Sequence, residues 1–126
     1  MKKVLLVDDD VLLRELLGLI VQKHGYELKK AENGLDAIPM VGSFQPDLIV
    51  LDILMPVMDG REFLAQLKAR GYANQNILIL TSMQDNALFK ELQALGVNKI
   101  ATKPIAMRAL EELIVALVSD EAGGES

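Results

Sequence analysis

The sequence contains no cysteine, and this absence excludes both a disulfide framework and a metal site built on thiolates. It also lacks any apolar stretch near the roughly 20 residues that a bilayer-spanning helix needs. The opening MKKVLLV resembles the start of a signal peptide. Aspartates directly follow its apolar run, which is therefore shorter than the roughly 7–15 apolar residues that such a peptide requires. We therefore expect a soluble, cytoplasmic protein without a membrane segment.

An excess of positive charge is missing as well. Lys and Arg number 13 against 18 Asp and Glu, and the resulting net charge of −5 argues against direct binding of nucleic acid by this domain. The 126 residues are 51% hydrophobic and 25% charged, which is typical of a folded globular chain. We expect one domain over residues 1–120, and a disordered tail or the start of a linker over residues 121–126.

Short apolar segments alternate with longer stretches in which leucines recur at helical spacing. The apolar segments predict five strands, at residues 3–7, 27–31, 47–51, 77–80 and 99–101. Three of them (VLLV, LIVL and ILIL) are apolar throughout, which indicates strands that are covered on both faces of a parallel sheet. The sequence therefore predicts an α/β fold of five β-α units in a doubly wound arrangement.

Helix boundaries are marked by residues that commonly cap helices. Asp10 can begin the first helix and Gly25 can end it, while Gly71 and Gly96 follow the third and fourth helices. The second helix, near residues 33–44, contains a proline at position 39, which we expect to kink or shorten it.

Polar side chains follow four of the predicted strands, and doubly wound sheets bind ligands at this edge. They are Asp8 and Asp9, Asp52, Thr81 and Lys103. The three carboxylates outweigh the single ammonium group, so a divalent cation is needed to balance the charge, and Mg²⁺ suits an oxygen-rich site. Asp52 could then act as a nucleophile toward a phosphoryl group, with Thr81 and Lys103 stabilising the phosphoryl oxygens.

These pieces resemble the receiver domain of two-component response regulators, particularly chemotaxis response regulators. The matching motifs are VDDD, DLIVLDILMPVMDG, LTS and TKP, in the same order and spacing along nearly the whole chain. The resemblance implies a flavodoxin-like fold of strand order 2-1-3-4-5. It also implies a phosphorylation-controlled switch in a phosphorelay, not an enzyme in the ordinary sense, beyond self-phosphorylation from phosphodonors and autodephosphorylation.

The resemblance also implies partners and a metal site. The donor would be a histidine kinase or a phosphotransfer protein, and the output a protein partner or a fused domain. That partner would read the face made by the fourth helix, fifth strand and fifth helix. Asp52 would be the phosphoacceptor, and Mg²⁺ would be held by Asp9, Asp52 and the backbone carbonyl of Leu54, with Asp8 acting largely through water.

For the switch, the resemblance implies that Thr81 moves toward the phosphoryl group and that Lys103 pairs with it. The bond from Lys103 to Pro104 would be cis. Receivers often carry an aromatic side chain three positions before this lysine, one that turns inward on activation. Ile100 stands there instead, so the expected readout is a change of rotamer of an aliphatic side chain.

Two other functions stay open on the sequence alone. The triplet Asp8-Asp9-Asp10 also resembles the nucleophile motif of haloacid-dehalogenase-type phosphatases, in which Asp8 would carry the phosphoryl group. A receiver-shaped interaction module that is never phosphorylated is the other alternative. Outside the site, we expect His24 to face the end of its helix and solvent, and Phe89 either to pack sideways or to serve a partner surface.

Overall fold

The computed structural model describes residues 1–53, 58–72, 75–82, 84–97 and 99–119. Within these ranges strands and helices alternate five times, as the sequence predicts. The elements are β1 (Lys3–Val7), α1 (Val11–His24), β2 (Glu27–Ala31), α2 (Gly34–Phe44), β3 (Leu48–Leu51), α3 (Gly60–Ala69), β4 (Ile77–Thr81), α4 (Asn86–Ala94), β5 (Lys99–Thr102) and α5 (Met107–Ser119). Of the helices so described, none has both the length and the apolar character needed to cross a membrane.

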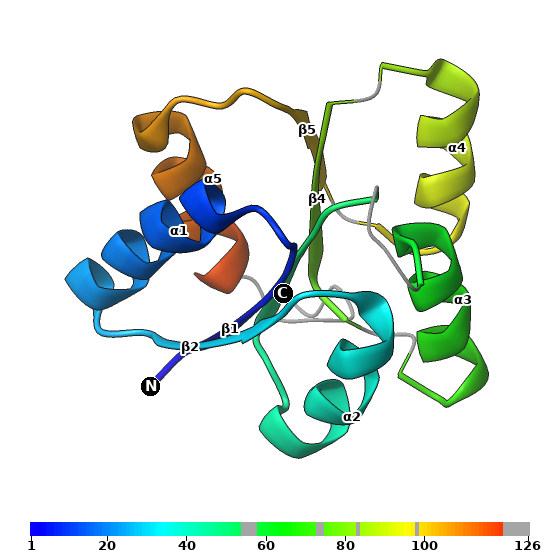
Figure 1. Cartoon of the computed structure of the whole chain (residues 1–126), viewed down its shortest axis with the longest axis horizontal. Coiled ribbons are helices and arrows are strands. Elements are labelled where there is room, and N and C mark those ends of the chain that lie inside the picture. Colours follow the sequence, from blue (N-terminus) through cyan, green and yellow to red (C-terminus); the bar gives the residue numbers. More distant parts are fainter. Residues whose placement is uncertain (54–57, 73–74, 83, 98, 120–126) are drawn as a thin grey trace.

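The five strands form one parallel sheet in the order β2-β1-β3-β4-β5, which confirms the predicted flavodoxin-like topology. Helices α1 and α5 cover one face of the sheet, and α2, α3 and α4 cover the other (Figure 1). Successive strand residues point to opposite faces. Val4 and Leu6 therefore pack under α1 and α5, whereas Leu5 and Val7 pack under the other three helices. Burial on both faces explains why the segments VLLV, LIVL and ILIL of β1, β3 and β4 are apolar throughout.

The caps of α1 are those predicted. The Asp10 carboxylate accepts a hydrogen bond from the Leu13 N–H at 3.2 Å, and Gly25 adopts a left-handed φ of 72° at the other end. Of the two effects expected of Pro39, the shortening of α2 is wrong, because the helix continues to Phe44. The kink stays a prediction. Because Pro39 lacks only one N–H, the burial of Ile38, Val41 and Phe44 keeps the rest of the helix in place.

Three strand boundaries differ by one residue from those predicted. Asp47 precedes β3, where its carboxylate accepts a hydrogen bond from the Lys3 N–H at 2.8 Å. At the other edge, β4 includes Thr81 and β5 includes Thr102, because these residues still pair with each other. At the carboxyl edge the prediction stopped at the last apolar side chain, whereas strand pairing continues to the threonines. At β3 it instead included one polar residue that precedes the strand.

Candidate functional site

Backbone hydrogen bonds continue past the carboxyl ends of the strands and hold the predicted site residues side by side. The Asp8 N–H donates to the Ala31 carbonyl at 3.0 Å, and the Asp52 N–H donates to the Val7 carbonyl at 3.1 Å. The Lys103 N–H likewise donates to the Thr81 carbonyl at 2.8 Å. Residues that lie 95 positions apart in the sequence therefore meet at one edge of the sheet.

The side chains of Asp8, Asp52 and Lys103 converge there. Lys103 Nζ lies 3.1 Å from Asp8 Oδ2 and 3.3 Å from Asp52 Oδ2, within hydrogen-bond distance of both. Asp8 is 1% exposed and Asp52 11%, whereas Lys103 is 21% exposed and so reaches the site from its rim. The structure thus brings together the nucleophile candidate and the cation that sequence reasoning assigned to it.

Burial and charge act in opposite directions on these groups. Burial raises the pKa of Asp8, and the charge of Asp52 adds to this effect, although a hydrogen bond from the Asp10 N–H and the charge of Lys103 work against it. Burial alone would lower the pKa of Lys103, but the charges of Asp8 and Asp52 and their hydrogen bonds raise it overall. Lys103 therefore stays an ammonium ion, and the ionised form of Asp8 is less favoured than that of an exposed aspartate.

The acidic side chains could hold a metal ion. Asp8, Asp9 and Asp52 each offer a carboxylate oxygen, and these oxygens all lie within 4.8 Å of one another. All the donor atoms are oxygens, and the carboxylates outnumber the ammonium group of Lys103. Such a site suits Mg²⁺, which takes few protein ligands and keeps water or phosphate in its remaining coordination positions. The fourth ligand implied by the resemblance, the Leu54 carbonyl, lies outside the described residues.

Thr81 ends β4 and is completely buried. In the parallel register Ile79 pairs with Ile100, and both pack in the core under α2, α3 and α4. Because strand side chains alternate, Thr81 shares this face of the sheet with Ile79. The Lys103–Pro104 peptide bond is cis, as the resemblance implied.

Two cavities flank this region. One of about 360 Å³ lies beside the acidic site and is lined by Asp10, Lys103 and the apolar side chains of Leu12, Leu16 and Ile105, among others. The other, of about 330 Å³, lies between α4 and β5, where Phe89 and Ile100 line it. Lys103 lines the first of these cavities and Ile100 lines the second.

Sequence reasoning missed one neighbour of the site. Asp10 was assigned only to the cap of α1, yet its second carboxylate oxygen lies 3.8 Å from Lys103 Nζ. The signal for this proximity was the unbroken run of three aspartates at a strand end. The charge count of the site therefore includes a fourth carboxylate at its rim.

The structure also places two side chains outside the site. His24 does not simply face the end of its helix: its Nε2 lies 2.7 Å from Glu111 Oε2 on α5, and its ring stacks on Tyr26. This contact between the two helices is possible because α1 and α5 lie on the same face of the sheet (Figure 1). Phe89 is half-buried against the core and also lines the cavity beside Ile100.

Fold and site together define a doubly wound α/β domain with an acidic cluster at the carboxyl edge of its sheet. Residues 4–115 match the response regulator receiver domain. The chain is 34% identical over 119 residues to the chemotaxis protein CheY of Halobacterium salinarum, covering 91% of this chain and 98% of that protein. It is 33% identical over 113 residues to sporulation initiation phosphotransferase F of Bacillus subtilis, covering 90% of each.

Among solved structures, the chemotaxis response regulator CheY4 of Vibrio cholerae superposes with a TM-score of 0.84 and 30% identity, covering 93% of this chain and 98% of that one. The chain therefore belongs to the family of response regulator receiver domains, and chemotaxis proteins are among its relatives. Its function is that of a receiver in phosphorylation-based two-component signalling, and the phosphatase alternative is not favoured.

Proposed function

We propose that Asp52 is the residue that accepts the phosphoryl group, and that the protein works as a switch and not as an enzyme with turnover. The observation that carries this proposal is the contact of Lys103 Nζ with both Asp52 and Asp8 at 3.3 and 3.1 Å. Asp52 retains 11% exposure, so a donor can reach it, whereas Asp8 at 1% is closed off. This difference in access favours Asp52 over the Asp8 nucleophile of the phosphatase reading.

The transfer is a substitution at phosphorus. An oxygen of the Asp52 carboxylate forms a bond to the phosphorus atom, and the bond from phosphorus to the donor breaks, leaving its electron pair on the departing atom. Lys103, already placed against Asp52, then has an N–H to donate to a phosphoryl oxygen. The buried Thr81 hydroxyl at the end of β4 supplies a second contact in this proposal.

Asp8, Asp9 and Asp52 would hold Mg²⁺, since their carboxylate oxygens lie within 4.8 Å of one another. When bound, the ion supplies positive charge that offsets the carboxylates and positions for phosphoryl oxygens. The protein favours binding of the ion because it places three carboxylates beside a single ammonium group. The participation of the Leu54 carbonyl stays a prediction.

The readout of phosphorylation would pass from Thr81 to the neighbouring strand β5. Thr81 and Ile79 share one face of the sheet, and Ile79 pairs with Ile100. The cavity of about 330 Å³ beside Ile100 and Phe89 gives both side chains room to repack when Thr81 shifts. A change there alters the surface of α4, β5 and α5, which we propose that a downstream protein or a fused output domain recognises.

The immediate partner is a protein that carries phosphohistidine, either a histidine kinase or a phosphotransfer protein. Response regulators pair with such kinases and with output partners, and this chain shares their fold and acidic site. A domain boundary near residue 120 and a cytoplasmic location stay predictions.

Incubation with acetyl phosphate and Mg²⁺, followed by intact mass measurement, tests the proposal. Wild type should gain the mass of one phosphoryl group, and Asp52→Asn should gain none. If wild type stays unmodified under these conditions, the interaction module that is never phosphorylated becomes the better explanation. If Asp52→Asn is still modified, another residue is the acceptor.

A further inference from the structure

The two carboxylate oxygens of Asp10 have different partners. Oδ1 accepts the hydrogen bond from the Leu13 N–H at 3.2 Å that caps α1, whereas Oδ2 lies 3.8 Å from Lys103 Nζ. The Asp10 N–H donates to Asp8 Oδ1 at 2.9 Å, so the backbone at this position is also held. With 42% of its side chain exposed, Asp10 places a fixed negative charge at the mouth of the site.

This charge lies close to the proposed nucleophile. Asp10 Oδ2 and Asp52 Oδ2 lie 3.8 and 3.3 Å from the same nitrogen, so they are at most about 7 Å apart. Asp10 and Lys103 also line the cavity of about 360 Å³ that borders the site. A small donor that approaches Lys103 through this cavity therefore comes against the Asp10 carboxylate before it reaches Asp52.

Small phosphodonors differ in what they bring to this position. In an acyl phosphate the phosphorus–oxygen bond breaks and a carboxylate departs with its negative charge. In a phosphoramidate the phosphorus–nitrogen bond breaks and the electron pair stays on a nitrogen that bears protons, so a neutral amine departs. A fixed carboxylate repels the first leaving group and can accept a hydrogen bond from the second.

We propose that Asp10 sets the donor selectivity of this receiver, by disfavouring acyl phosphates relative to phosphorus–nitrogen donors, the class to which phosphohistidine belongs. This inference rests on the proposed role of Asp52 as acceptor. Asp10 would then have two functions: it caps α1, and it determines donor specificity, a function that Asp8 and Asp9 do not share.

The test compares acetyl phosphate with phosphoramidate in wild type and Asp10→Asn at saturating Mg²⁺. Asparagine caps helices as well as aspartate does, so the cap of α1 should be kept. Circular dichroism and a thermal melt check that helix content and stability are unchanged. At low ionic strength the substitution should raise the rate with acetyl phosphate about fivefold and the rate with phosphoramidate less than about twofold. In 1 M salt, where the screening length is about 3 Å, the difference should largely disappear.

Asp47→Asn is the matched control, because it removes the same charge at the opposite edge of the sheet, where Asp47 accepts a hydrogen bond from the Lys3 N–H. It should leave the ratio of the two rates unchanged. The inference is overturned if Asp10→Asn leaves this ratio unchanged, or if Asp47→Asn shifts it equally.

A measurement without any donor gives an independent readout. If Asp10 acts through its charge, Asp10→Asn should weaken the binding of Mg²⁺ alone by about two- to threefold at low ionic strength, and Asp47→Asn should not. Unchanged Mg²⁺ affinity would contradict the electrostatic origin. If wild type takes no phosphoryl group on Asp52, the proposed function itself is wrong. If wild type and Asp10→Asn are both phosphorylated with the same ratio of the two donor rates, only the inference on Asp10 is wrong.

Discussion

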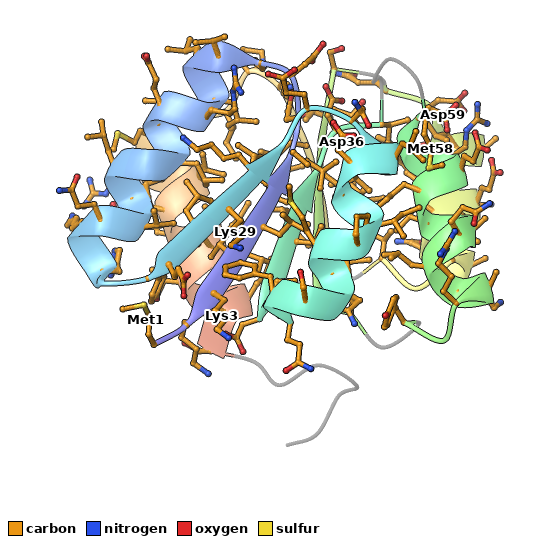
Figure 2. The ribbon with its side chains drawn as sticks, turned by 60° about the horizontal axis from the view of Figure 1, so that its bottom comes forward. Met1, Lys3, Lys29, Asp36, Met58 and Asp59 are labelled. Carbon is orange, nitrogen blue, oxygen red and sulfur yellow. The ribbon has the colours of Figure 1, made fainter. Side chains whose placement is uncertain are left out.

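At the carboxyl edge of the sheet, aspartates gather around one lysine, whereas the amino edge carries side chains that mainly tie elements together. Figure 2 shows Met1 and Lys3 toward one end of the molecule and Asp36 and Asp59 toward the other. At the amino edge, Lys3 binds Asp47 through its N–H, and Asn76 donates to a carbonyl of α5. The two edges are the opposite ends of the same five strands, so the strands themselves do not decide where function lies.

The difference arises because helices α1 to α4 begin at the carboxyl edge. Each uses a side-chain oxygen of Asp or Asn to cap its first N–H groups, namely Asp10, Asn33, Asp59 and Asp85. An aspartate at this edge therefore has an ordinary structural explanation. Asp8 and Asp52 differ from the caps of α2, α3 and α4 because they are buried and hydrogen-bond to Lys103. Asp10 combines both features, since it caps α1 and lies 3.8 Å from Lys103 Nζ. Proximity to Lys103, and not the residue type, sets these aspartates apart from those that only cap helices.

The largest effect should follow from Lys103→Ala, which removes the cation from the carboxyl edge. The rate of phosphorylation by acetyl phosphate and Mg²⁺ should fall by about 10²- to 10³-fold, because the donor of hydrogen bonds to the phosphoryl group is lost. Lys29→Ala removes a lysine that lies over the Phe44 ring, on the edge strand β2, and should stay within about twofold of wild type. A Lys103→Ala rate within threefold of wild type would contradict this role.

Asn76→Ala should have the reverse effect, on stability and not on phosphorylation. Asn76 is 3% exposed and its amide donates to the Leu117 carbonyl at the end of α5. The substitution removes this amide donor, so the carbonyl loses a hydrogen bond. The free energy of unfolding should fall by about 1–3 kcal/mol in urea titrations. A phosphorylation rate that falls as far as that of Lys103→Ala would show that the two edges are not separable.

Asp8→Asn should stabilise the metal-free protein. Burial raises the pKa of Asp8 above its ordinary value of 3.8, so its contribution to stability is full below that value and is lost as the pH rises through the folded-state pKa. At neutral pH the substitution should raise the free energy of unfolding by about 0.5–2 kcal/mol, while weakening Mg²⁺ binding. The gain should narrow on acidification, and a gain that instead widens would refute the assigned cause.

The smallest effect should come from Glu111→Gln, on the contact between α1 and α5. Hydrogen bonds from His24 and from Lys23 lower the pKa of Glu111 below its ordinary value of 4.5, although burial opposes them. A lowered pKa adds stability above pH 4.5 that is lost as the pH falls through the folded-state pKa. The variant should melt about 1–3 °C below wild type at neutral pH. This gap should close in acid, and one that persists there would exclude the ion pair as its source.

The sequence predicted the sheet and the proximity of three of the candidate site residues, because both depend on local patterns. Strands that are apolar on every residue must be buried on both faces, so VLLV, LIVL and ILIL could be recognised without a structure. The residues after those strands then had to meet at one edge, and this predicted Asp8, Asp52 and Lys103 as neighbours.

What the sequence could not predict depends on the directions of side chains and on distant partners. The approach of Asp10 Oδ2 to Lys103 follows from how the cap of α1 turns its carboxylate, which composition does not reveal. The contact between His24 and Glu111 joins residues 87 positions apart on two helices of the same layer. Continuation of α2 past Pro39 likewise depends on tertiary burial that outweighs a local preference.

Locating the phosphoryl group within the chain is the most direct measurement. Wild type treated with acetyl phosphate and Mg²⁺ can be reduced with borohydride, which converts an aspartyl phosphate to homoserine, and then digested and sequenced by mass spectrometry. We expect homoserine at position 52, and none at position 8. Homoserine at position 8, or none anywhere, would contradict the proposal that Asp52 beside Lys103 receives the phosphoryl group.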